Sequence, residues 1–120
     1  MEKQTFNIRD LAGPWLDYAV FLSEQRSGIA VSKPVFVLAE RADTARDWFS
    51  PSMKQEHGGP IIDRAGISTV FLDIPRGWRA SMASSAGIGY LDAGGPTRLI
   101  AAMRCYALRS LGDLLIVELP

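Results

Sequence analysis

The chain has 120 residues, with 13 Lys plus Arg against 13 Asp plus Glu, one His and one Cys. One cysteine excludes an internal disulfide and a multi-cysteine metal site, and one histidine excludes a multi-histidine metal site. Zero formal net charge argues against a strongly basic nucleic-acid module, and the length predicts a single domain over 1–120.

The N-terminal half predicts one long helix followed by one strand. Apolar side chains recur at spacings of three and four over 14–25, which predicts an amphipathic helix that stops near Gly28. The β-branched run 35–39 predicts a strand. The irregular stretch that follows contains Trp48 and Phe49, which either pack on the domain or face a partner.

A Gly-Pro pair precedes three apolar segments, at 13–14, 59–60 and 95–96. Proline lacks the N–H that would stay unpaired in a first helical turn, so each pair predicts a helix start. We therefore expect a short helix over 60–65 and a longer helix over 96–111, each ended by a glycine.

The remaining apolar segments predict strands. Three successive runs separated by turn formers are typical of an antiparallel meander: 67–73, 78–83 and 87–91. A last run over 114–119 predicts a strand that is either central or paired across a homodimer, because it would promote aggregation on an open edge. The order predicts an α+β fold, with two main helices and one short helix on a mainly antiparallel sheet.

Few side chains of this sequence are suited to catalysis. Cys105 lies near Arg98 and Arg109 on the predicted last helix, which favours either a reactive thiol or a small packing residue. A nucleophilic cysteine needs a base, and the only histidine, His57, lies on a separate segment. No Ser-His-Asp set or carboxylate pair stands out, so the sequence leans against an enzyme, and no cofactor or metal is expected.

Two other binding chemistries remain open. Arginines interleaved with aromatic residues are typical of a single-strand nucleic-acid platform, and residues 74–120 contain five arginines. Arg76 and Arg79 lie around a predicted hairpin turn, and Arg98, Arg104 and Arg109 lie on the predicted last helix. Those on the predicted last helix point in two directions, so they form no single stripe. The Gly-Gly-Pro sequences at 58–60 and 94–96 suit either an anion at a helix N-terminus or a tight turn.

Three stretches of the chain carry a family resemblance. They are Leu16 to Val20, Phe49-Ser50-Pro51-Ser52 before Gly58-Gly59-Pro60, and the block from Gly95 to Asp113. In this order and spacing they resemble the NinX-like family of small phage and prophage proteins, over about Leu11 to Pro120. The resemblance implies an accessory protein encoded near phage recombination and replication genes, and it supplies no catalytic residues.

We expect a non-enzymatic module that binds a host or phage protein, with nucleic-acid binding or anion binding as alternatives. The expected protein contact comprises Trp48, Phe49, Ser50, Pro51, Ser52, Gly58 and Gly59. The expected nucleic-acid contact comprises Arg98, Arg104 and Arg109. The sequence has no run typical of a secretory signal or a membrane span, so we expect no membrane partner and a location in the bacterial cytoplasm.

Overall fold

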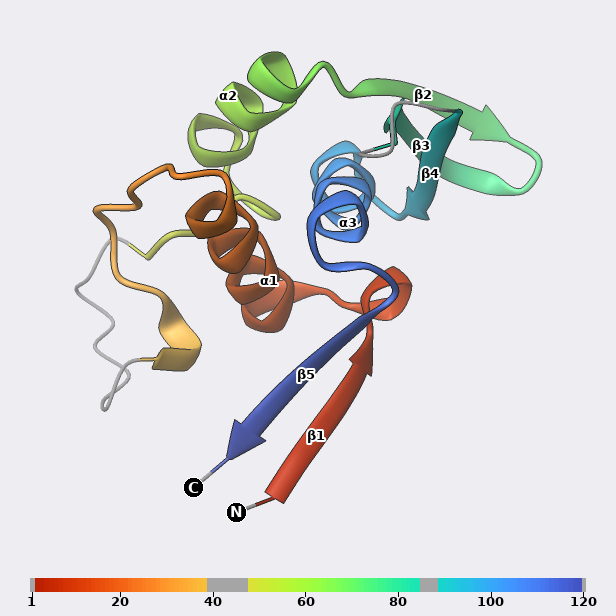
Figure 1. Ribbon diagram of the computed structural model, residues 1–120. Coiled ribbons are helices and arrows are strands. Elements are labelled where there is room, and N and C mark those ends of the chain that lie inside the picture. Colours follow the sequence, from red (N-terminus) through yellow and green to blue (C-terminus); the bar gives the residue numbers. More distant parts are fainter. Residues whose placement is uncertain (1, 39–47, 85–88, 120) are drawn as a thin grey trace.

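The computed structural model describes residues 2–38, 48–84 and 89–119 (Figure 1). Its element order confirms the α+β fold class. The α-helices of the described part are α1 (Gly13–Arg26), α2 (Gln55–Ala65) and α3 (Arg98–Leu111), with 3-10 turns at Ile8–Asp10 and Phe36–Leu38. Its strands are β1 (Glu2–Asn7), β2 (Ser68–Asp73), β3 (Arg76–Ala83), β4 (Tyr90–Gly95) and β5 (Leu114–Leu119).

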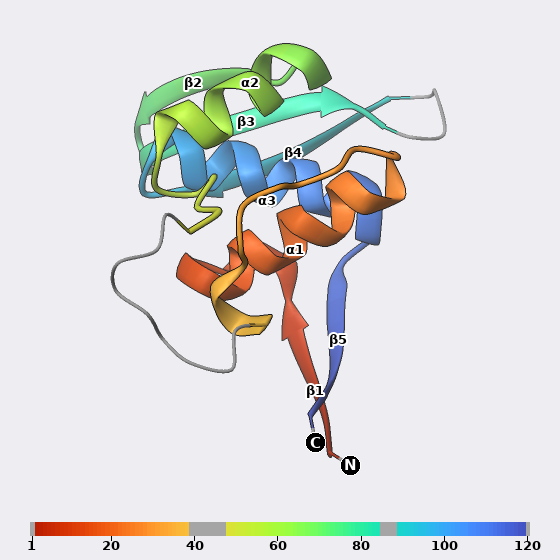
Figure 2. The same cartoon turned by 90° about the vertical axis from the view of Figure 1, so that its left-hand side faces the viewer.

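The described strands form two antiparallel sheets rather than the single sheet expected. β1 and β5 make a two-stranded ribbon, and β2, β3 and β4 make a three-stranded meander. A two-residue turn, Ile74-Pro75, joins β2 to β3, with Asp73 opposite Arg76 at its base. Figures 1 and 2 show the ribbon projecting from the body, with both chain ends at its far tip.

α3 lies at the centre of the fold, between α1 and the three-stranded sheet (Figure 1). Small side chains allow this close packing on two sides: Ala101, Ala102 and Ala107 of α3 are fully buried. Ala80 and Ala93 of the sheet, which pair across β3 and β4, are fully buried as well. The broad apolar arc at helical spacing in the sequence therefore corresponds to a helix covered on two faces.

A row of aromatic rings connects the β1–β5 ribbon to the body. The Phe6 and Trp15 ring centroids lie 4.9 Å apart, and Tyr18 and Phe21 extend the row along α1. Leu115 of β5 lies opposite Phe6 and is buried. Two-stranded ribbons are marginal in isolation, so these contacts with α1 stabilise this one.

β5 pairs with β1 along its whole length, in a ribbon of two strands. It is therefore not a central strand as one expectation had it, and pairing of its other edge across a homodimer stays a prediction. β1 was not predicted, because its stretch Lys3-Gln4-Thr5 is polar and exposed. A strand with one solvent-exposed face and few apolar side chains shows no alternation of apolar and polar residues in the sequence.

The predicted strand over 35–39 is also wrong. The structure places a 3-10 turn at Phe36–Leu38, and Ala39 lies outside the described residues. The carbonyl of Pro34 accepts a single main-chain hydrogen bond from Phe49, at 2.9 Å. A strand needs a ladder of main-chain partners, and β-branched side chains alone do not supply one.

Two of the three predicted helix starts are wrong. Pro60 lies inside α2, which begins at Gln55, so 58–60 presents no free helix N-terminus and offers no anion site of that kind. Gly95 ends β4, and α3 is capped by Thr97, whose hydroxyl accepts from the Ile100 N–H at 3.1 Å. A hydroxyl cap accepts a hydrogen bond from a free N–H group of the first turn, which a Gly-Pro pair cannot do.

The predicted strand boundaries are shifted in the meander. β3 begins at Arg76, before the predicted 78, because the turn takes up only two residues. β4 runs to Gly95 rather than ending at 91, and residues 85–88, where a turn was expected, lie outside the described part. The predicted helix stops are confirmed, with Gly66 and Gly112 following α2 and α3 at positive φ.

Candidate functional site

The loop expected to contact a protein partner packs mainly against its own chain. The buried Phe49 ring stacks on His57 of α2, with ring centroids 6.0 Å apart. The Ser50 N–H donates to Nδ1 of the same imidazole at 2.9 Å. Trp48 is half-buried with its ring edge against Phe36, at a centroid distance of 5.3 Å. This leaves little of the loop available for a partner.

Gly58 and Asp17 fix the rest of this loop. A β-carbon on Gly58 would overlap the Pro51 carbonyl oxygen and lie 2.8 Å from Cδ2 of Leu99, so only glycine fits. The N–H of the buried Ser52 donates to Oδ1 of the buried Asp17 at 2.9 Å. The loop thus contacts both α1, through Asp17, and α2, through Gly58. These are segments that carry the family resemblance.

Gly59 has a different environment from Gly58. A β-carbon on Gly59 would meet the side-chain amide of Gln55, which is exposed at the start of α2. A flexible side-chain end can move aside, whereas the main chain of the loop cannot. The two glycines are therefore adjacent but unequal, and the tight main-chain approach belongs to Gly58.

The three arginines of α3 do not form one surface. Arg104 is half-buried, and its guanidinium donates to the carbonyls of Leu11 at 2.7 Å and Gly94 at 3.0 Å. Arg98 donates to Oγ1 of Thr69 at 3.1 Å, near the start of β2. Arg109 is exposed at the opposite end of the helix. Arg104 is thus committed to main-chain carbonyls, and the other two are separated by the length of α3.

The buried Glu24 carboxylate holds a polar cluster that was not predicted from the sequence. The Tyr106 hydroxyl donates to Oε1 of Glu24 at 2.6 Å, and Arg64 pairs with the same oxygen. Burial, with the Glu24 contact second, raises the pKa of Tyr106 above its ordinary value. These three side chains come from α1, α2 and α3 and satisfy one another, so the cluster joins the helices.

Cys105 is a packing residue with a protonated thiol. Its fully buried Sγ donates to the Leu91 carbonyl at 3.5 Å. Burial, supported by the Asp92 charge, raises its pKa from 9.0 to about 11. The Arg98 and Arg109 charges considered in the sequence analysis do not contribute to this shift.

We expect Cys105 to resist alkylation in the folded protein. A pKa near 11 lowers the thiolate fraction at neutral pH by about 100-fold relative to a thiol of pKa 9.0. Iodoacetamide labelling followed by intact-mass measurement checks this, with the urea-unfolded chain as the control that should label fully. Rapid stoichiometric labelling of the folded chain would contradict this assignment.

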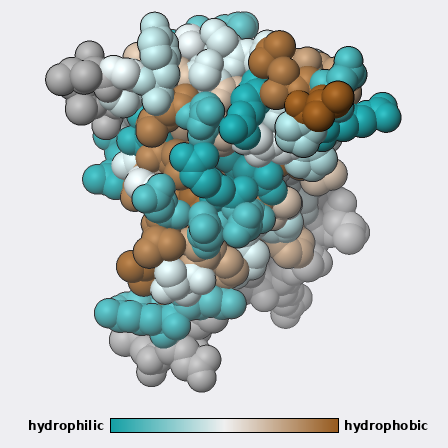
Figure 3. All heavy atoms as spheres, turned by 90° about the vertical axis from the view of Figure 1, so that its right-hand side faces the viewer, coloured by the Kyte–Doolittle hydropathy of each residue, from teal (hydrophilic) through white to brown (hydrophobic). Residues whose placement is uncertain are grey.

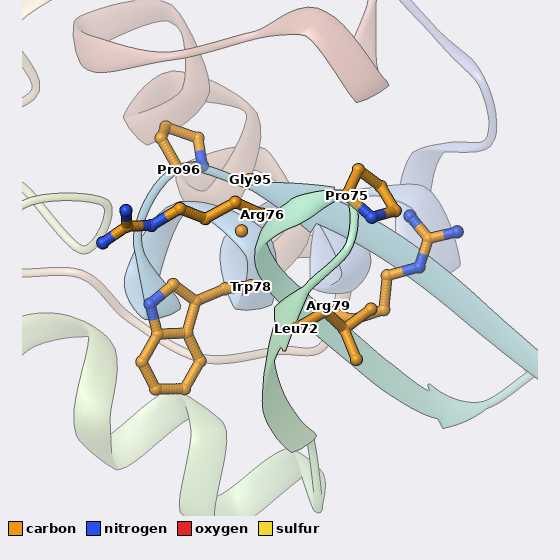
Figure 4. Close-up of a pocket in the computed structure, with 8 residues that line it drawn as sticks. Leu72, Pro75, Arg76, Trp78, Arg79, Gly95 and Pro96 are labelled. Carbon is orange, nitrogen blue, oxygen red and sulfur yellow. The ribbon is translucent and has the colours of Figure 1, made fainter.

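One concave site of the described part lies at the turned end of the β2–β3 hairpin. This hairpin pocket has a volume of about 350 Å³. Its lining comes from the hairpin and from the end of β4, and includes Leu72, Pro75, Arg76, Trp78, Arg79 and Pro96. Figure 4 shows Arg76 and Trp78 on one side of the hairpin, and Leu72 and Arg79 on the other.

Aromatic and basic groups lie together at this pocket. The Phe71 and Trp78 rings meet edge to face at a centroid distance of 5.5 Å, and the Arg76 guanidinium lies 6.0 Å from the Phe71 ring centroid. Arg79 contacts Asp92 across 3.6 Å, with both side chains about half exposed. An exposed ion pair of this kind contributes little to stability, so Arg79 remains available for a partner.

The same end of the molecule exposes an unusual amount of apolar surface. Ile74 is 92% exposed, and Val70 and Phe71 are 52% and 44% exposed. Figure 3 shows apolar side chains gathered over the hairpin end and, separately, over β5. Contiguous apolar patches are uncommon on monomers and mark interaction sites. Arg76 and Arg79 could be recognised from the sequence, but the exposed apolar residues beside them could not, because the pairing of β2 with β3 brings the two sets together.

Within the described ranges, no helix is long and apolar enough to cross a membrane, and no three His, Cys, Asp or Glu side chains gather to hold a metal ion. The chain matches a family described as "Bacteriophage P22, NinX" over residues 7–110, which covers most of its length. No curated protein matches the chain. The family match confirms the resemblance noted in the sequence.

Proposed function

Because this chain belongs to the bacteriophage P22 NinX family, we propose that it is a phage accessory protein that binds a host or phage protein without catalysing a reaction. The hairpin pocket is the observation that carries the proposal. It combines an exposed apolar surface with Trp78, Arg76 and Arg79. Tryptophan and arginine are the residue types most enriched among residues that dominate protein–protein binding energies.

The pocket suits a partner segment with apolar and acidic side chains. A volume of about 350 Å³ accommodates one or two apolar side chains beside Trp78 and Pro96. The Arg76 and Arg79 guanidinium groups that line it attract carboxylates, and Arg79 is offset by one exposed carboxylate, that of Asp92. The pocket is therefore complementary to an acidic, apolar segment.

The hairpin pocket supports this function better than the loop first expected to carry it. Phe49, Pro51 and Ser52 are buried, so a partner reaches only the edges of that loop. Met53, which follows the loop, is 73% exposed but does not line the hairpin pocket. We therefore assign the contact to the hairpin pocket.

We expect Trp78→Ala to weaken partner binding by at least about 30-fold. Removing an indole from the centre of an interface costs about 2 kcal/mol or more. A tagged pull-down from phage-infected cells identifies the partner, and titration of the purified pair gives the affinity. Tyr90→Ala is the matched control, because Tyr90 is 82% exposed on the same sheet yet does not line the pocket.

Two results would count against this assignment. One is a folded Trp78→Ala variant that binds the partner as tightly as the parent chain. The other is an equal loss of binding in Tyr90→Ala. The double variant Arg76→Glu with Arg79→Glu provides a second probe, which should weaken binding of an acidic partner and reduce its salt dependence.

Nucleic-acid binding is the second candidate. Arg76 and Trp78 lie on the same side of the hairpin, with Arg79 on the other side, and this pair suits nucleic acid better than the separated arginines of α3 do. Guanidinium groups beside an indole suit phosphates and stacked bases. The zero net charge and the acidic neighbours Asp73 and Asp92 weigh against it. Nuclease treatment of the pull-down, with a steep fall of affinity with salt, distinguishes this function from protein binding.

A further inference from the structure

The two edges of the three-stranded sheet differ in how they are covered. The β4 edge is covered by arginines, since the Asp92 carbonyl accepts from Arg9 at 2.7 Å and the Gly94 carbonyl accepts from Arg104 at 3.0 Å. β2, at the other edge, pairs only with β3 among the described strands. Its outer main-chain groups make no hydrogen bond within the part of the chain that the structure describes.

The open β2 edge is also apolar. Every residue of β2 except Thr69 is exposed, including the consecutive Val70, Phe71 and Leu72. Proteins protect such edges with prolines, inward charges or bulges, because an open apolar strand is a template for pairing with another chain. β2 carries none of these along Ser68 to Leu72, so it is suited to pairing.

We propose that β2 pairs with β2 of a second copy of this chain, antiparallel and about a two-fold axis at Phe71. In this register Val70 lies opposite the second copy's Leu72, and the two Phe71 side chains face each other. Aromatic and β-branched cross-strand pairs stabilise antiparallel sheets. The result is a six-stranded sheet, with the α3 helices of both copies on the same side.

The symmetry of this register supports it. Residue 69 pairs with 73, 70 with 72, and 71 with 71, so each pair joins two odd-numbered or two even-numbered residues. The outward main-chain groups of one β2 therefore meet the outward groups of the other, and the faces of the two sheets match. A two-fold pairing of this kind is self-complementary, as a dimer interface must be.

Charge complementarity supports a second copy as the occupant. The register places Thr69 opposite the second copy's Asp73, on the face that carries α3. Arg98 already donates to the Thr69 hydroxyl at 3.1 Å, so its guanidinium lies close to the position of that carboxylate. The two-fold axis generates this Arg98–Asp73 contact twice. Leu72 belongs both to the hairpin pocket and to this edge, but Asp73 and Arg98 do not line the pocket, so variants at these two positions test the dimer separately from the proposed function.

Charge exchange between the two contact positions tests the dimer. Sedimentation equilibrium of the full chain should show a concentration-dependent dimer. Asp73→Arg alone and Arg98→Asp alone should each raise the dissociation constant by at least about 10-fold, since each places like charges opposite each other twice. An equimolar mixture of the two variants should restore dimers, because both contacts regain opposite charges.

The design separates dimerisation from folding. An acidic residue at position 98 falls in the first turn of α3, where a negative charge is favourable, and the mixture cannot restore a misfolded chain. Ile116→Lys on β5, which is 60% exposed, is the matched control and should leave the dimer intact. A monomer at every concentration would overturn the inference. So would a dimer that neither charge variant weakens, or one that Ile116→Lys dissociates.

Discussion

Gly58→Ala should lower the free energy of unfolding by about 2 kcal/mol or more. The added β-carbon overlaps the Pro51 carbonyl oxygen and crowds Leu99, so either α2 or the loop must move. Overpacking at a buried site costs about 1–3 kcal/mol, and the contact here is with main chain, which cannot rotate away. Urea denaturation followed by circular dichroism measures the loss.

Gly59→Ala is the matched control for this prediction. It introduces the same change one residue later in α2, where the atoms nearest to the new β-carbon belong to the exposed Gln55 side chain. That side chain can turn aside at the loss of one hydrogen bond, which its Oε1 accepts from Arg98 at 3.3 Å. Alanine is favoured over glycine in a helix by about 1 kcal/mol, so this variant should be neutral or more stable than the parent. If the two variants lose equal stability, the tight approach of Gly58 to Pro51 is not what requires glycine.

Asp17→Ala should lower the free energy of unfolding by about 1–3 kcal/mol, whereas Asp17→Asn should not lower it. Alanine leaves the buried Ser52 N–H without its acceptor, and an unsatisfied buried donor carries a cost of this size. Asparagine keeps an acceptor oxygen and removes the buried charge. Urea denaturation at neutral pH ranks the three proteins.

The pH dependence gives an independent check on Asp17. Burial raises its pKa above the ordinary 3.8, although hydrogen bonds from Ser52 oppose the shift. Below pH 3.8 the carboxyl is protonated in both the folded and the unfolded state. As the pH rises through the raised folded pKa, the unfolded state has already lost its proton, so the folded state loses relative stability. Between pH 3.8 and the raised pKa of the folded state, the free energy of unfolding of the parent chain should therefore fall relative to that of Asp17→Asn. A rise with pH in this range would contradict the assignment.

The sequence predicted elements whose signals are local. The helical spacing over 14–25 and 96–111, the glycine stops and the turn at Pro75 each depend on neighbours within a few residues. The structure has these elements within about two residues of the expected positions, with the last helix starting at Arg98 rather than at 96. The last strand, 114–119, was predicted with its observed bounds. The family resemblance was also available from sequence, because it depends on short motifs in a fixed order.

The candidate sites depended on contacts that no local pattern contains. The strand expected at 35–39 failed for lack of a ladder partner, and β1 escaped notice because its partner β5 lies at the other end of the chain. The loop at 48–52 had the composition of a binding segment, but Asp17, His57 and Gly58 bury it.

The sequence by itself therefore determined the α+β class, the main helices, the hairpin and the family. Only the tertiary structure decided that Arg104 and Cys105 serve packing, and that Arg76, Trp78 and the apolar β2 edge share one surface. The physical reason is that helix and turn signals come from short-range sterics and periodicity. Surfaces and strand partners are set instead by which distant segments the packing around α3 brings together.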